Sequence, residues 1–287
     1  MPRKAREKSG SGIYHVMMRG VNRQLIFEDR EDREYFLELL LKYRKRSGFE
    51  LYGYCLLGNH VHLLLKECAG PSIVEYKGEE VEIGEGEELE AVFKRINVSY
   101  VAYFNRKYKR TGHLFQDRFK SECVENDDYL LHVLRYIHMN PVKAGICEKP
   151  EEYEFSSFNE YMEGPKICKT GFVLGMLSRE KLRDFTYEKN EDKFMDVDET
   201  ADEFLTDEDV KQIIKSLTGC ANTAEFQKLD INERNNAFVE LVEAGIPVAQ
   251  ISRMTGYSRM LVYRAAQAPQ LQAASCKLQG DEVRLRG

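Results

Sequence analysis

Two apolar runs joined by a turn limit what this chain can fold into more than any other feature. FELYGYCLL and VHLLLK lie on either side of Gly58-Asn59. Such runs favour strands, and Gly-Asn between them favours the turn of a hairpin. Side chains two positions apart on a strand point to the same face, so the second strand places His60 and His62 side by side. Two neutral imidazoles in this arrangement can bind one divalent cation.

A His-x-His pair alone is a weak signal, because one histidine could be exposed and the other packed in the core. The segment RYIHMNP, predicted to be helical, adds a second group. Tyr136 and Asn140 are four residues apart and so share one helix face. The amide oxygen of Asn140 could complete a metal site with His60 and His62, and oxygen ligands suit Mg²⁺ or Mn²⁺. The alternative is that Tyr136 is a core aromatic and Asn140 a helix cap.

A tyrosine beside a metal ion has a specific chemical use. A cation bound to a non-bridging phosphate oxygen withdraws negative charge and orients the phosphorus for in-line displacement. A phenol with an unperturbed pKa of about 10 is mostly protonated at neutral pH, so the cation must also help it lose its proton. The product is a covalent phosphotyrosine that preserves bond energy for a later rejoining step. A nuclease that uses water would not need Tyr136.

The remaining elements predict an α+β fold. We expect a strand at 13–19, an amphipathic helix at 29–46, a helix at 88–108, a strand or short hairpin in HLFQDRFKSECVE, and a helix in DDYLLHVLRYIHMN that Asn126 or Asp127 caps and Pro141 stops. The order resembles the ferredoxin-like split βαβ pattern with an antiparallel sheet. Such a sheet has one face for helices and one face free, and we expect function on the free face.

The charge distribution points to a polyanionic partner despite a net charge of -6. Residues 71–90 carry a net charge of -7 and residues 184–208 a net charge of -9, whereas residues 91–120 carry +7 and residues 244–280 hold only basic charges. Two acidic segments therefore mask two basic modules, and basic modules bind phosphate backbones.

Length and composition exclude several classes. A chain of 287 residues is long enough for two domains. No apolar run reaches the ~20 residues of a membrane span, and the basic start lacks the apolar segment of a signal peptide. The seven cysteines include no CxxC pair, so neither a disulfide framework nor a cysteine zinc site is expected. We expect a cytoplasmic, nucleoid-associated protein without a membrane partner.

The C-terminal part contains a pattern typical of a helix-turn-helix, IPVAQISRMTGYSRMLVYR at 246–264. Ile251 and Val262 fall at inward positions, Gly256 lies where the turn needs a left-handed residue, and Ser258 can cap the second helix. Arg259 and Arg264 would then face duplex DNA. The alternative is a three-helix packing unit that does not contact DNA.

At this point the sequence resembles the REP-associated tyrosine transposases, a family of single-strand HUH transposases that use one tyrosine. The resemblance rests on four motifs in consistent order, and it covers residues 13–163. The motifs are YHVMMRGVNRQLIF at 14–27, YCLLGNHVHLLLK at 54–66, GHLFQDRFKS at 112–121 and RYIHMNPVKAG at 135–145.

The resemblance implies a role for each matching residue. His60 and His62 match the HUH pair, Tyr136 the nucleophile and Asn140 the third metal ligand. Family members cut single-stranded DNA near palindromic hairpins, at repetitive extragenic palindromes or element ends, and leave a 5′-phosphotyrosine and a free 3′-hydroxyl. The RGxNR stretch is implied to read a short guide sequence, and other basic side chains are expected to contact the DNA backbone. The residues expected at the DNA are Arg19, Asn22, Arg23, Lys94, Arg95, Arg118, Lys120 and Lys143.

Residues 68–90 depart from the family, because they are longer and more acidic than its usual link there, which puts the local groove shape in doubt. His132 lies on the same helix face as Tyr136 and could be a ligand, a base or a packed bystander; we favour the bystander. We leave His15 and His113 as ordinary strand or loop residues.

The predicted organisation is a catalytic domain at 1–163, an acidic linker at 164–203, an all-helical helix-turn-helix domain at 204–268 and a flexible tail at 269–287. The protein is expected to be a monomer or homodimer. Two other functions are open: a DNA-binding regulator without catalysis, and a replication-initiator or relaxase-like nickase. The intact His, His, Tyr, Asn set argues against the first, and the lack of a helicase domain argues against the second.

Overall fold

The computed structural model describes residues 7–68, 70, 72–76, 79–83, 86–188, 194 and 205–267, with backbone alone for 72–76 and 79–83. The chain forms two compact units. Unit 1 comprises Met1–Gly20 and Ile26–Thr200, and unit 2 comprises Val21–Leu25 and Ala201–Gly287. The predicted tail and residues 189–193 and 195–203 of the predicted linker lie outside the described residues.

Unit 1 is built on a four-stranded antiparallel sheet with the order β2-β3-β1-β6. The strands are β1 (Ile13–Arg19), β2 (Glu50–Leu56), β3 (His60–Lys66) and β6 (Lys120–Cys123). In each of β1, β2 and β3, six of the seven residues are buried, as expected for strands covered on both faces. The predicted α+β class, an antiparallel sheet with helices followed by a largely helical region, is therefore confirmed.

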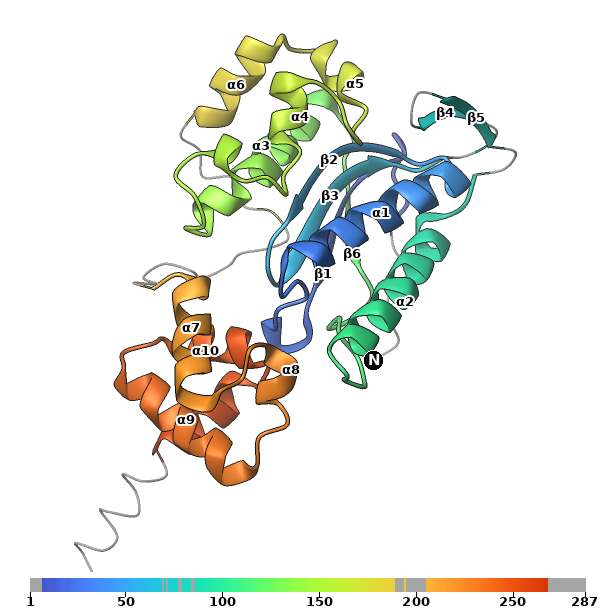
Figure 1. Ribbon diagram of the computed structural model, residues 1–287. Helices are drawn as coiled ribbons and strands as arrows, with labels where there is room; N and C mark the ends of the chain where they lie inside the picture. The colour runs from blue at the N-terminus through green and yellow to red at the C-terminus, as the bar shows by residue number, and fades with distance from the viewer. Residues whose placement is uncertain are drawn as a thin grey trace, which may run out of the picture. The chain divides into compact units, whose positions relative to one another are not determined.

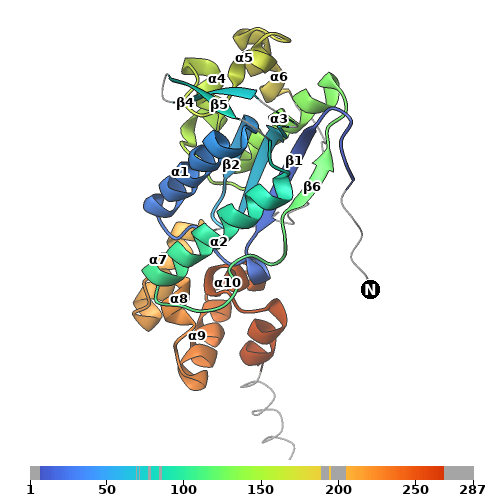
Figure 2. The ribbon, with the colours of Figure 1, turned by 90° about the vertical axis from the view of Figure 1, so that its right-hand side faces the viewer.

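One face of the sheet packs against α1 (Arg30–Ser47) and α2 (Leu89–Lys107), as Figures 1 and 2 show. Val16 of β1 and Val61 of β3 point to this face and join the core formed with Phe36 and Phe93. Each of these four side chains is fully buried. The alternate residues of the same strands therefore point to the opposite face.

The opposite face of the sheet is also covered, so the expectation of a free face was wrong. Helix α3 (Asp127–Lys143) lies on it, and Val133 and Leu134 pack against Cys55 and Leu64 of the sheet. The sequence argument failed because the four-strand, two-helix pattern ended before α3, and nothing local to α3 shows which surface its apolar side covers. Both layers are needed to bury the central strands.

Helix α3 begins where the sequence predicts but ends later. Asn126 caps it by accepting a hydrogen bond from the Tyr129 backbone N–H. Pro141 does not stop the helix, because Pro141 lies inside it and the helix continues to Lys143. A proline near the C-terminal end of a helix removes one backbone donor but leaves the last turn able to form.

Shorter elements complete unit 1. The helices that follow α3 are η2 (Pro150–Glu152), α4 (Phe158–Glu163), α5 (Thr170–Leu174) and α6 (Arg179–Tyr187). Val173 and Leu182 are buried in the core beside α3, so part of the predicted linker is packed structure. The acidic segment 68–90 contains a separate two-stranded sheet, β4 (Ser72–Tyr76) and β5 (Glu79–Ile83), which we did not predict.

Unit 2 is helical. Its elements are η1 (Val21–Arg23), α7 (Asp207–Thr218), α8 (Thr223–Phe226), α9 (Ile231–Glu243) and α10 (Val248–Thr255), followed by helical residues 259–267. Phe226, Phe238 and Ile251 form its buried centre, and Leu25 from the 21–25 segment joins that core. The chain thus leaves unit 1 for five residues after β1 and contributes an apolar side chain to unit 2.

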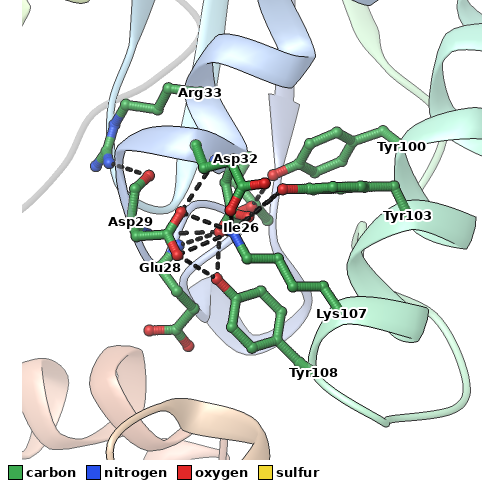
Figure 3. Close-up of polar contacts among 10 residues, drawn as sticks. Ile26, Glu28, Asp29, Asp32, Arg33, Tyr100, Tyr103, Lys107 and Tyr108 are labelled. Atoms are coloured by element: carbon green, nitrogen blue, oxygen red, sulfur yellow. Dashed lines mark hydrogen bonds and ion pairs between the residues drawn. The ribbon is translucent and has the colours of Figure 1, made fainter.

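A buried carboxylate joins the start of α1 to the end of α2 in unit 1 (Figure 3). Asp32 is fully buried and accepts hydrogen bonds from Lys107 Nζ at 2.9 Å, from the Tyr108 hydroxyl at 2.8 Å and from the Glu28 backbone N–H at 2.8 Å. Asp29 caps α1 and also accepts from Lys107. A buried carboxylate remains charged only when it is paired and hydrogen-bonded in this way.

Asp32→Asn should lower the free energy of unfolding by about 2–3 kcal/mol. The substitution removes a negative charge that pairs with Lys107 and leaves a neutral amide buried in its place. Urea unfolding followed by circular dichroism measures this change. The matched control is Glu31→Gln, since Glu31 also pairs with Lys107 but is 71% exposed; its loss should cost less than ~1 kcal/mol. Equal losses for the two variants would contradict a special role for the buried carboxylate.

Candidate active site

The register between β1 and β3 sets three histidines on the face covered by α3. Arg19 lies opposite His60, and Met17 lies opposite His62. His15 is two residues before Met17 and shares its face of the sheet, as His60 and His62 share theirs. The rings of His60 and His62 are 5.0 Å apart between centroids, and both side chains are buried.

Helix α3 brings Tyr136 to this group. The Tyr136 and His62 rings meet edge to face with their centroids 5.5 Å apart, and Tyr136 is only 5% exposed. Gly53 of β2 permits this approach, because a Cβ at that position would lie 2.6 Å from the Leu134 Cδ1 atom of α3. Glycine in β2 therefore leaves room for the Leu134 side chain of α3.

Hydrogen bonds orient both histidines through the same ring nitrogen. His60 Nδ1 lies 2.6 Å from Asn59 Oδ1, and His62 Nδ1 lies 3.0 Å from His15 Nε2. In each ring Nε2 is then the nitrogen that could bind a metal ion. A ligating imidazole commonly uses its second nitrogen in this way, because the hydrogen bond fixes the tautomer and the ring orientation.

The electrostatic environment keeps His62 in the form that binds metals. Burial lowers the pKa of His62 well below its usual value, and the nearby His60, His15 and Arg19 lower it further. Burial also lowers the pKa of His15, although Glu122 opposes that shift. His62 is therefore neutral at neutral pH, and a neutral imidazole has the lone pair that a cation needs.

Asn140 lies one helical turn beyond Tyr136 on α3 and is 7% exposed. Its amide nitrogen is buried and has no hydrogen-bond acceptor among the described residues. Buried amides are normally satisfied, so the amide N–H groups suit an acceptor such as a phosphate oxygen, and the amide oxygen is the atom that could bind a cation. Within the described part of the chain, no group of three or more His, Cys, Asp or Glu side chains is arranged for a metal ion. A set of two imidazoles and an amide is therefore the donor set to consider.

Two further side chains contact the Tyr136 ring. Lys143 Nζ lies 5.0 Å from the ring centroid, and the Phe194 ring centroid lies 4.9 Å away. The ammonium group lies over the aromatic ring, which is a cation–π contact. Phe194 also contacts His15 and Tyr129, so it covers the same side of the site.

The structure gives the other histidines separate roles. His132 Nδ1 receives a hydrogen bond from Arg135, and its ring packs against Phe185. His138 is buried with Nε2 2.9 Å from Ser157 Oγ, and burial lowers its pKa to about 3.

His15 was missed as a site residue. Strand alternation places it on the correct face of β1, but only the pairing of β1 with β3 shows that it reaches His62.

The residues predicted to contact DNA are dispersed. Arg19 ends β1 in unit 1, whereas Asn22 and Arg23 belong to unit 2 and have left-handed backbone angles, with φ of 53° and 62°. The Asn22 amide donates to the Gly256 carbonyl within unit 2. The remaining predicted contacts in unit 1 are Lys94 and Arg95 on α2, Arg118 just before β6, Lys120 in β6, and Lys143 on α3.

Some of these basic residues already have acidic partners. Arg95 pairs with Glu87, and Arg118 Nη1 lies 2.7 Å from Glu90 Oε1. Lys94 and Lys120 are exposed. In unit 2, Arg259 and Arg264 are exposed on the helical segment 259–267. Arg95 and Arg118 would have to exchange a carboxylate for a phosphate in order to contact a nucleic acid.

Comparison with known proteins relates the N-terminal part of the chain to transposases. Residues 9–76 match the family described as "Transposase IS200 like", the Y1 transposases. This match includes β1 and the His60–His62 pair and ends before α3. The stretch that carries the two histidines is thus related to the IS200-like transposases.

A protein of Haemophilus influenzae assigned by name to the REP-associated tyrosine transposases is 24% identical over 142 residues, which cover 47% of this chain and 77% of that protein. A solved structure of a REP-associated tyrosine transposase bound to a REP hairpin has 15% sequence identity and a TM-score of 0.48, over 72% of this chain and 100% of that one.

None of the helices in the described part of the chain combines the length and apolar character needed to cross a bilayer.

Gly53→Ala should destabilise unit 1 by about 1–3 kcal/mol, because the added methyl group overlaps Leu134 Cδ1 and forces that fully buried side chain to move. Urea unfolding measures the change. Gly171→Ala is the matched control, since a Cβ at Gly171 in α5 meets nothing within 4 Å; it should be neutral or slightly stabilising. If Gly53→Ala and Gly171→Ala change the free energy of unfolding equally, the packing of α3 on β2 does not depend on glycine at position 53.

Proposed function

We propose that this protein cuts and rejoins single-stranded DNA near palindromic hairpins through a covalent 5′-phosphotyrosine at Tyr136. The observation that carries the proposal is the edge-to-face contact between Tyr136 and His62 beside His60. Two elements distant in sequence, α3 and β3, place a phenol against a pair of imidazoles. The relation of residues 9–76 to the IS200-like transposases supports the same chemistry.

The residues fit a divalent cation, Mg²⁺ or Mn²⁺. His60 and His62 would hold it through Nε2, and Asn140 would supply the third protein ligand. When bound, the cation withdraws negative charge from a phosphate oxygen and favours the ionised phenol. This donor set leaves positions open for substrate and water, which is typical of catalytic rather than structural metal sites.

In the proposed reaction, Tyr136 Oη attacks the phosphorus of the scissile phosphodiester. The phosphorus–Oη bond forms as the bond between phosphorus and the 3′-oxygen breaks, and the 3′-oxygen takes up a proton to leave a free 3′-hydroxyl. Lys143 beside the Tyr136 ring stabilises the phenolate. Attack by a 3′-hydroxyl on the phosphotyrosine reverses the step and rejoins the strand.

The proposed substrate follows from relatives and from charge. The Haemophilus influenzae relative is assigned to the REP-associated tyrosine transposases, and another such transposase has been solved with a REP hairpin. We assign Arg19, Asn22 and Arg23 to guide-sequence recognition. We assign Lys94, Arg95, Arg118, Lys120 and Lys143 to the sugar-phosphate backbone.

We also take the sheet of unit 1, in which β3 pairs antiparallel with both β1 and β2, to be the ferredoxin-like split βαβ arrangement.

Unit 2 is proposed to bind duplex DNA as a helix-turn-helix. Gly256 ends α10 with a φ of 74°, and Ser258 Oγ accepts a hydrogen bond from the Leu261 N–H at the start of the next helix. Ile251 and Val262 are fully buried. The exposed side chains of the second helix are Arg259, Met260, Tyr263 and Arg264. A face of two arginines with an aromatic and an apolar side chain suits a DNA groove better than solvent alone.

Tyr136→Phe should abolish the covalent protein–DNA adduct, because the phenyl ring fills the same space without a nucleophilic oxygen. Incubation of the full chain with hairpin oligonucleotides and Mn²⁺, followed by denaturing electrophoresis, measures the adduct. Hairpin affinity measured by fluorescence anisotropy should change less than about threefold, since phosphate contacts remain.

The matched control is Tyr187→Phe, which removes the hydroxyl of a tyrosine that is 42% exposed on α6; it should form adduct at the wild-type rate. An adduct that survives in Tyr136→Phe would show that the nucleophile is misassigned. Hairpin binding by the wild type without any adduct would favour a regulator without catalysis.

Replacing Arg259 and Arg264 together by Ala should weaken binding to duplex DNA and reduce the slope of log affinity against log salt by about 2, one for each lost phosphate contact. Anisotropy titrations at several salt concentrations measure the slope. Lys215→Ala in α7 is the control for loss of positive charge in the same unit and should leave the slope within about 0.3 of wild type. An unchanged slope in the double variant would indicate a packing unit without DNA contact.

A further inference from the structure

We propose that His15 and Glu122 are positioning residues that hold His62 in the tautomer that presents Nε2 to the metal ion. This inference rests on the proposed function, because it concerns the same site. The two residues come from β1 and β6, and Glu122 lies opposite His15 in the β1–β6 register. The His15 ring also meets the Tyr136 ring edge to face, with the centroids 6.1 Å apart. Its two ring nitrogens face His62 and Glu122, so the positioning role passes through His62.

The geometry forms a continuous polar chain inside unit 1. His62 Nδ1 lies 3.0 Å from His15 Nε2, and His15 Nδ1 lies 3.8 Å from Glu122 Oε2. The second separation is an ion-pair distance rather than a hydrogen bond. Both of its atoms are buried, and neither has a hydrogen-bond partner among the described residues. A movement of less than ~1 Å would turn this contact into a hydrogen bond.

The proton positions follow from the arrangement. A metal ion on His62 Nε2 requires the ring proton on Nδ1, so His62 donates to His15 Nε2. His15 then accepts at Nε2 and must carry its own proton on Nδ1, which faces Glu122. The carboxylate is acceptor-only when ionised, so it completes the chain without conflict. One arrangement of protons is therefore compatible with both contacts and leaves His62 Nε2 unprotonated.

The outer end of the chain returns to the helix of the nucleophile. The Tyr129 hydroxyl donates to Glu122 Oε1 at 2.5 Å, and Tyr129 lies in the first turn of α3, seven residues before Tyr136. The polar chain from Tyr129 to His62 thus connects α3 to β6, β1 and β3. It constrains Tyr136 relative to the histidine pair as well as the tautomer of His62.

A packing role alone does not explain His15. The side chain is fully buried, and an apolar residue would fill the same volume without the cost of removing an imidazole from water. A role as the base for Tyr136 also fits poorly, because both His15 nitrogens already face His62 and Glu122. The arrangement instead matches the pattern in which an outer carboxylate and imidazole orient a metal ligand.

The test compares His15→Leu, His15→Gln and Glu122→Gln in the full chain. Mn²⁺ affinity is measured by isothermal titration calorimetry without DNA, and the tautomer of His62 by ¹⁵N chemical shifts. His15→Leu should lose 10–100-fold in Mn²⁺ affinity, the usual effect of removing an outer partner of a ligating histidine. His15→Gln should retain more affinity than His15→Leu, because the amide oxygen can still accept from His62 Nδ1.

Glu122→Gln covers the case in which His15 variants fail to fold, since the Glu122 side chain is 36% exposed; it should weaken Mn²⁺ binding several-fold. The matched control is His138→Gln. It removes another fully buried histidine of unit 1 that does not belong to the polar chain from Tyr129 to His62, and it should leave Mn²⁺ affinity unchanged.

The outcomes separate this inference from the proposed function. If the wild type binds Mn²⁺ and loses it in His62→Ala, while His15→Leu and Glu122→Gln bind as tightly as wild type, the positioning role is overturned and the metal site stands. If the wild type binds no Mn²⁺, both the positioning role and the proposed metal site are overturned. If His15→Leu and His15→Gln lose affinity equally and His62 keeps its tautomer, His15 only packs and the inference is overturned.

Discussion

The pairing of β1 with β3 is the constraint on which the rest of the site depends. Its register sets His15, His60 and His62 on one face and Val16 and Val61 on the other. A shift of one residue would reverse every side chain and bury the histidines against α1 and α2. The apolar contacts on the α1–α2 face therefore hold the polar groups of the opposite face in place.

Helix α3 turns that face into an enclosed site. It covers the apolar part of the sheet with Val133 and Leu134 and presents Tyr136 to His62 from the same side. Burial then has a chemical effect, because the interior that excludes water also keeps His62 neutral. A free sheet face would leave the imidazoles solvated and the tyrosine without a fixed position.

Much of the local structure could be predicted. The strand expected at 13–19 is β1, and the helix expected at 29–46 is α1 with ends shifted by one residue. These predictions succeeded because alternation and helical spacing are local properties of the sequence. The end of α3 could not be predicted from Pro141. A proline in the last turn removes one backbone hydrogen bond, and packing of the helix against the sheet can offset that loss. The β4–β5 pair lies in a Glu-rich segment whose composition does not favour strands.

The sequence by itself determined that His60 and His62 share one face and that Tyr136 and Asn140 share another, because each pair lies within one element of fixed periodicity. Only the tertiary structure decided that the two faces meet, that Gly53 permits their approach, and that His15 reaches His62. These contacts join strands and helices far apart along the chain. Their geometry depends on strand register and helix packing, which are set by the whole core of unit 1 rather than by neighbours in sequence.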